Sequence, residues 1–120
     1  MKLLTTALLS LPLTCLAADW QQYATTTDAK VFYDPATVTW SSSTTFDVWS
    51  RMDFGPTDKD VSHVMIENEI NCETHMAKTL FMAVQLRNGE VKQFNDDKLW
   101  SVDEGAPADN LLNLLCKKGI

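Results

Sequence analysis

The sequence predicts an α+β domain: an antiparallel, meander-like β-sheet of about six strands, with one C-terminal α-helix packed on one face. Apolar residues recur at every second position through most of the chain, which is typical of half-buried strands. Turn-forming residues separate these runs, and Asn88-Gly89 is the strongest hairpin signal among them. Only after Ala108 does the apolar spacing become helical.

Composition limits the chain to one domain and argues against two classes of partner. The 120 residues are 45% hydrophobic, which is enough for a single core. The formal charge of -6 argues against nucleic acid and anionic membranes, since both require a basic patch. Lys117 and Lys118 form the only adjacent basic pair.

Residues 1–18 have the pattern of a secretory signal peptide, which leaves residues 19–120 as one exported domain. The apolar stretch is too short for a membrane span, so we expect no transmembrane span in the mature form. The features that carry this prediction are the positive Lys2, the apolar run 3–16 and the small-x-small cleavage site Cys15-Leu16-Ala17. We therefore expect the protein in the periplasm or at the outer membrane and cell surface.

Export changes what the three cysteines imply, because oxidising compartments form and keep disulfides. Cys15 leaves with the signal. In an alternative hypothesis it is a lipidated N-terminus, but Pro12 and Thr14 stand where lipoprotein signals normally have a leucine and a small residue. Cys72 and Cys116 then remain as the one pair, and we predict a disulfide between them. Closing a loop of about 45 residues contributes roughly 4 kcal/mol to stability.

The first third of the chain predicts short strands. Residues 18–27, which include Trp20, form an edge strand, and residues 29–34 form a second strand that Pro35 ends, because proline donates no backbone hydrogen bond. Residues 37–40 are β-branched and aromatic and predict another short strand before a polar turn.

Residues 45–54 predict a half-buried antiparallel strand with two distinct faces. Phe46, Val48, Met52 and Phe54 fall on the core parity, which Ser50 interrupts; Asp47, Trp49, Arg51 and Asp53 fall on the other. Trp49 is thus the one aromatic residue that core packing does not explain. Because tryptophan and arginine are enriched in protein contacts, we predict a dimer or partner surface at Trp49 and Arg51, or at the edge strand near Trp20.

Residues 61–72 and 76–86 predict a central hairpin. The apolar parity of the first run contains Val64, Ile66, Ile70 and Cys72, and that of the second Met76, Leu80, Met82, Val84 and Leu86. Cys72 therefore points toward the core.

The C-terminal quarter predicts a returning strand at 90–94, a turn at Asn95-Asp96-Asp97 and a short extended piece at 99–102 with Trp100 inward. A helix then begins near Ala108, with Asp109 suited to its positive end. Its apolar stripe is Ala108, Leu111, Leu112, Leu115 and Cys116, and its predicted stop is Lys117-Lys118-Gly119.

A set of landmarks spans the mature chain: Trp20, Tyr33-Asp34, Val48-Trp49, Cys72 ending a long strand, Gly89 in a turn, Trp100 and a leucine-rich last helix closed by Cys116. In this order the chain resembles the surface-adhesin protein E family of Gram-negative bacteria. The resemblance implies an antiparallel sheet with a C-terminal helix pinned by one disulfide. It also implies binding to host extracellular-matrix or plasma glycoproteins, and homodimers, as in some relatives. The chain departs from the family pattern at residues 41–45 and 104–107.

The polar residues show no convincing catalytic or metal-binding pattern. Cys72-x-x-His75, with Glu73 and His63 nearby, offers one short ligand pair where structural zinc requires two. As nucleophile and base, Cys72 and His75 lack an orienting third residue. The candidate paired carboxylates, Asp53 with Asp58 or Asp60 and Asp96 with Asp97, lie mainly in turn-rich segments, where carboxylates more often form turns than hydrolyse substrates.

We therefore expect a non-catalytic binding module without cofactor or metal, and a surface adhesin for host glycoproteins is the favoured form. A periplasmic structural component, or an inhibitor of another secreted protein, is the alternative. A small hydrolase is the least favoured of the three classes.

Overall fold

The computed structural model describes residues 19–116. The predicted signal peptide with its boundary at residue 18, the predicted fate of Cys15 and the predicted helix stop at Lys117-Lys118-Gly119 lie outside this range. The elements are, in order, β1 (Gln21–Thr25), β2 (Ala29–Tyr33), the 3-10 turn η1 (Pro35–Thr37), β3 (Thr39–Trp40), β4 (Thr45–Phe54), β5 (Val61–Asn71), β6 (Met76–Leu86), β7 (Val91–Ser101) and the helix α2 (Pro107–Cys116).

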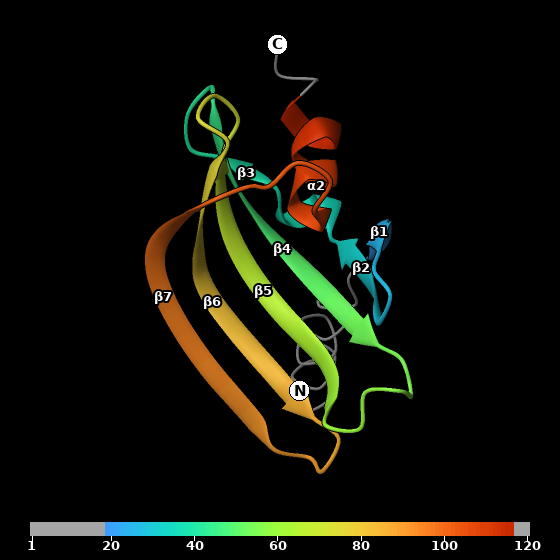
Figure 1. The fold of residues 1–120 in the computed structure, drawn as a ribbon. Helices are drawn as coiled ribbons and strands as arrows, with labels where there is room; N and C mark the ends of the chain where they lie inside the picture. The colour runs from blue at the N-terminus through green and yellow to red at the C-terminus, as the bar shows by residue number, and fades with distance from the viewer. Residues whose placement is uncertain (1–18, 117–120) are drawn as a thin grey trace, which may run out of the picture.

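One antiparallel sheet contains all seven strands, and α2 lies across one end of one of its faces (Figure 1). The strand order is β1-β2-β4-β5-β6-β7, so neighbours in space are almost always neighbours in the chain. The predicted class is therefore confirmed. The sheet has seven strands where about six were expected, and the two-residue β3, which lies within the short strand predicted at 37–40, pairs with the start of β4 through Thr39 and Trp40.

Strand alternation gives the sheet two different faces. On β4, Phe46, Val48 and Ser50 point toward α2 and are buried, and we call this side the helix face. Trp49 and Arg51 point to the opposite side, which we call the outer face. The α-helix of residues 19–116 packs on the helix face, so the outer face carries no helix within that range.

The core lies between α2 and the adjacent end of the sheet. Leu111 and Leu112 are almost fully buried there, as the predicted apolar stripe requires, and each contributes about 1.5–3 kcal/mol of burial free energy. The Asp109 carboxylate accepts a hydrogen bond from the Gly105 backbone N–H at 3.0 Å, which secures the start of the helix. The buried cluster consists of Tyr33, Phe46, Val48, Ile70, Ala77, Leu111, Leu112 and Cys116.

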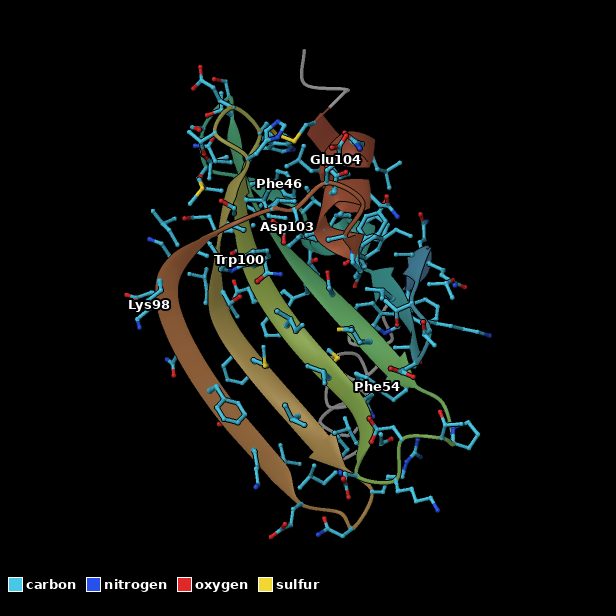
Figure 2. The ribbon with its side chains drawn as sticks, viewed as in Figure 1. Phe46, Phe54, Lys98, Trp100, Asp103 and Glu104 are labelled. Carbon is cyan, nitrogen blue, oxygen red and sulfur yellow. A yellow bond between two sulfur atoms is a disulfide. The ribbon has the colours of Figure 1, made fainter. Side chains whose placement is uncertain are left out.

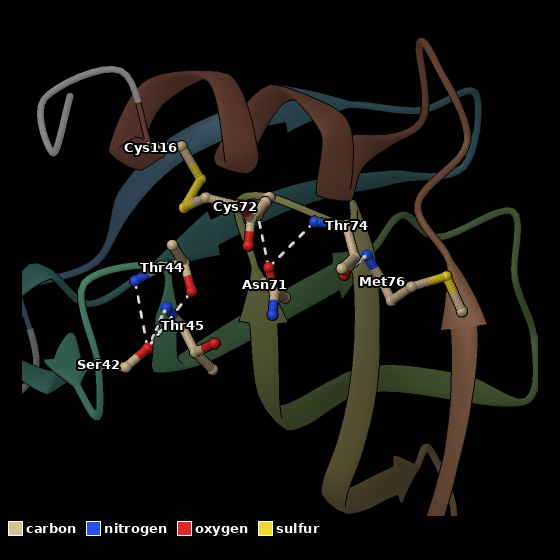
Figure 3. The surroundings of a disulfide bond; sticks show 9 residues. Ser42, Thr44, Thr45, Asn71, Cys72, Thr74, Met76 and Cys116 are labelled. Carbon is tan, nitrogen blue, oxygen red and sulfur yellow. Dashed lines mark hydrogen bonds between the residues drawn. A yellow bond between two sulfur atoms is a disulfide. The ribbon is translucent and has the colours of Figure 1, made fainter.

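The predicted disulfide between Cys72 and Cys116 is confirmed, with the two Cα atoms 5.6 Å apart (Figure 3). Cys72 directly follows β5, and its backbone N–H donates to the Thr44 carbonyl at 2.6 Å. The Asn71 side-chain oxygen accepts the backbone N–H groups of Glu73 and Thr74 at 2.8 and 3.0 Å. These hydrogen bonds, made by the Cys72 backbone and the Asn71 side chain, thus hold the turn that carries Cys72 in place.

A β-bulge in β6 changes the predicted pattern of the central hairpin. Glu67 pairs with Phe81 but Asn68 pairs with Thr79, so Leu80 is an extra residue in β6. Between the start of β6 and this bulge, the residues that point to the helix face are therefore not those that the simple alternation predicts. Ala77, rather than Met76, is buried on the helix face. The prediction that Met76 shares a face with Met82, Val84 and Leu86 was therefore wrong.

Two predicted boundaries were also wrong. Asn95-Asp96-Asp97 is not a turn, because β7 runs unbroken from Val91 to Ser101 along β6 with register shifts in its middle. The predicted pieces at 90–94 and 99–102 are parts of this one strand, and Trp100 does pack inward against the core cluster. The first edge strand begins at Gln21, so Trp20 precedes it.

Candidate functional site

The outer face presents a cluster of apolar side chains around Trp49. The rings of Trp49 on β4 and Phe81 on β6 lie 5.7 Å apart between centroids, tilted by 55°. Arg51 pairs across the sheet with Phe32 on β2 and with Met65 on β5, which extends the cluster along β4. All five side chains are half-buried, and together we call them the outer patch.

Arg51 supplies the positive charge in the outer patch. Its Nε atom makes an ion pair with the Asp53 carboxylate, and its side chain is 33% exposed, so the guanidinium is oriented yet accessible. His63 pairs with Asp53 across the strands. Desolvation and the nearby Arg51 charge lower the pKa of His63, so that ring is neutral at pH 7.

Trp20 does not lie with Trp49 and Arg51. It precedes β1, which is separated from β4 by β2 in the sheet. The structure therefore places two of the three predicted surface residues together and one apart. Trp40, an exposed tryptophan, packs on Phe46 on the helix face with ring centroids 5.0 Å apart.

The sequence did not predict a pair of carboxyl groups that lies beside the outer patch. Glu67 pairs across the sheet with Trp49 and with Phe81, and when protonated it can donate a hydrogen bond to Asp47, whose Oδ1 atom is buried without a partner among residues 19–116. This hydrogen bond, followed by desolvation and the Asp47 charge, raises the pKa of Glu67 to about 7. The Glu67 carboxyl is thus partly protonated near pH 7, where a glutamate with an ordinary pKa is ionised. Asp47 and Glu67 lie on different strands, so only the strand register reveals the pair.

The helix face carries a second unforeseen feature, a row of polar side chains across four strands. Trp100 Nε1 on β7 donates to Thr79 Oγ1 on β6 at 3.2 Å, and Thr79 Oγ1 donates to Asn68 Oδ1 on β5 at 2.8 Å. On β4, Ser50 accepts from the Tyr23 hydroxyl at 3.4 Å. The sequence signal for this row is that Ser50 and Asn68 interrupt apolar parities, between Val48 and Met52 and between Ile66 and Ile70.

The catalytic and metal-binding candidates are placed in structural roles. Cys72 is in the disulfide, and His75 is an exposed turn residue with φ of 60°. The Asp58 carboxylate accepts the backbone N–H groups of Asp60 and Val61 at 3.0 and 2.9 Å, and these bonds lower its pKa. Across residues 19–116, no three His, Cys, Asp or Glu side chains gather as a metal site. No helix in that range is long and apolar enough to cross a membrane.

Comparisons with known proteins give one match. The family model described as surface-adhesin protein E matches residues 20–117, which is most of the chain. No curated protein matches the chain, and no solved structure does either. The matched range covers every strand, the helix and both bonded cysteines. The chain therefore belongs to the surface-adhesin protein E family.

Proposed function

We propose that this protein is a surface adhesin that binds a host extracellular-matrix or plasma glycoprotein, without catalysis, through the outer patch. Family membership supports an adhesin role and an exported or cell-surface location. The observation that carries the choice of surface is the Trp49–Phe81 ring pair beside Arg51, on a sheet face that no helix of residues 19–116 covers.

The physical argument concerns the residue types and their arrangement. Trp, Tyr and Arg dominate the energetics of protein interfaces, because they bury large apolar areas and also make directional polar contacts. The outer patch has both kinds of side chain on rigid neighbouring strands, so little ordering entropy is lost on binding. On β4, Asp47 and Asp53 flank Trp49 and Arg51 on the same face, which favours a partner surface that carries basic groups at its edge.

The first test replaces the two central side chains. We predict that Trp49→Ala with Arg51→Ala weakens binding to immobilised matrix and plasma glycoproteins at least tenfold, because both side chains contact the partner. Binding is measured by surface plasmon resonance with the protein purified after export.

Trp40→Ala is the matched control, since it removes an exposed tryptophan from the helix face. It should leave the affinity within twofold of the parent protein. Equal affinity of the Trp49→Ala, Arg51→Ala protein and the parent would eliminate the outer patch as the adhesive surface. The surface location is tested separately by protease treatment of intact cells, where resistance of the protein would favour the periplasmic alternative.

A further inference from the structure

A groove on the helix face runs between the start of α2 and the middle of the sheet. It encloses about 320 Å³, and its lining includes Met52, Ile66, Met82, Tyr23, Trp100 and Pro107. Figure 2 shows Trp100, near one end of β7, on the same side of the sheet as α2. A second hollow of about 360 Å³ continues it toward Phe94 and shares Thr79, Met82 and Trp100 with it. These volumes are in the range of small-molecule sites.

The polar row lies in this groove, and its hydrogen bonds have a fixed direction. The Trp100 indole N–H can only donate, so Thr79 Oγ1 accepts there and gives its own proton to Asn68. Asn68 presents its oxygen to Thr79, so its Nδ2 amide group points away from this bond. Within residues 19–116 that amide donates no hydrogen bond, although Asn68 lines the groove.

A second polar group lies diagonally across the sheet. Ser50 on β4 is 2% exposed, and its hydroxyl shares a hydrogen bond with the Tyr23 hydroxyl at 3.4 Å. Ser50 pairs with Ile66, two residues from Asn68 on the same face of β5. The Asn68 amide and the Ser50 hydroxyl thus face one mostly apolar groove, and a few placed polar groups in an apolar lining are typical of small-molecule sites.

The polarity of the side chains that line the groove indicates the chemical class of its ligand. No charged side chain lines the groove beside α2, so an ionised group there would lose its hydration without a counter-charge. Lys98 lines the hollow that continues the groove. An oxygen acceptor would take the hydrogen bond that Asn68 Nδ2 offers, while an apolar body would cover Met52, Ile66 and Met82. We propose that this groove binds an uncharged, mostly apolar small molecule that carries a carbonyl or ester oxygen. The groove lies on the face opposite the outer patch, so this site does not depend on the proposed adhesive surface.

The test uses Nile red, a neutral apolar dye with one carbonyl, titrated into the protein purified after export. We expect saturable binding with a blue-shifted emission. Methyl decanoate should displace the dye at a concentration at least tenfold lower than decanoate, which has the same chain but an ionised head. In NMR spectra of the parent protein, the dye should shift the Asn68 side-chain amide and Trp100 indole signals.

Asn68→Asp is the decisive variant, because it keeps the acceptor for Thr79 and replaces the free donor with a charged oxygen. It should weaken dye binding at least tenfold, while Trp49→Ala on the outer face should stay within twofold of the parent. Absence of saturable binding, equal displacement by decanoate, or loss of binding in Trp49→Ala instead of Asn68→Asp would each overturn the proposal. If Asn68→Asp does not fold by circular dichroism, unchanged Asn68 and Trp100 signals in the parent protein would overturn it.

Discussion

The Asp47–Glu67 pair shows how a single side chain makes stability depend on pH. The hydrogen bond to Asp47, desolvation and the Asp47 charge raise the pKa of Glu67 from 4.5 to about 7. Between these two values the folded protein binds more protons than the unfolded chain does. Stability is therefore greatest below pH 4.5 as far as this group is concerned, and it falls as pH rises toward 7.

We predict that Glu67→Gln removes most of this decline, because an amide donates to Asp47 without a titrating proton. At pH 7.5 the variant should exceed the parent in free energy of unfolding, by about 1 kcal/mol or less, since solvent screens an accessible pair. Urea denaturation at pH 5.0 and 7.5 measures the difference. Glu104→Gln, an exposed change in the turn before α2, is the control and should keep the parent slope. Parallel pH profiles of parent and Glu67→Gln would show that the pKa of Glu67 is not raised.

At the scale of elements, the alternation of apolar residues was sufficient to predict the strands but not the bulges and register shifts within them. The β5–β6 hairpin and α2 were predictable because their apolar residues repeat at 2.0 and about 3.6 positions. The bulge at Leu80 leaves no mark in composition, yet it reverses every facing residue from Met76 to Thr79. Asn95-Asp96-Asp97 looked like a turn because its polarity suits one, but β7 is an edge strand, where polar side chains are tolerated.

The candidate sites were predictable to the degree that they depend on one strand or one residue type. The disulfide needed only two cysteines and the prediction that the chain is exported, and the Trp49 face needed only the parity of β4. The groove and the Asp47–Glu67 pair needed the register of several strands. The alternation of apolar residues within one strand does not show how that strand is aligned with its neighbours. Turns and bulges between the strands set this register.

Arg87, directly after β6, fastens the loop between β4 and β5. Its Nε donates to the Asp58 carbonyl at 2.8 Å, and its Nη2 donates to the Phe54 and Gly55 carbonyls at 3.1 and 2.8 Å. One guanidinium thus holds three backbone acceptors of a turn-rich segment. The planar fork of arginine suits this task, whereas a lysine ammonium is a point charge.

We predict that Arg87→Ala raises amide hydrogen exchange in residues 55–60 at least tenfold, with a loss of only about 1 kcal/mol in global stability. Arg87→Lys should recover less than half of the lost protection. Lys59→Ala, an exposed change in the same loop, should leave exchange unaltered. The measurement is exchange followed by mass spectrometry, and unchanged protection in Arg87→Ala would contradict the assigned role.

For the whole molecule, contacts of α2 join parts of the chain that are far apart in the sequence. The strands follow one another in space, but α2 returns to pack near β1, where Asn110 Nδ2 donates to the Tyr23 carbonyl at 3.4 Å. The disulfide then ties the other end of α2 to the turn after β5, across a sequence separation of 44. The helix is thereby fixed at both ends, and with it one wall of the groove.

We predict that the Cys72→Ser, Cys116→Ser protein is destabilised by about 4 kcal/mol in free energy of unfolding, because the unfolded chain regains the entropy of a loop of this length. Small domains are stable by only about 5–15 kcal/mol, so much of the total depends on this bond. Urea denaturation measures the loss, and the parent protein reduced with dithiothreitol should unfold at nearly the same urea concentration as the variant. Because the helix also forms one wall of the groove, Nile red affinity should fall in the variant even where the sheet remains folded. A variant as stable as the oxidised parent would mean that leucine packing alone holds α2 on the sheet.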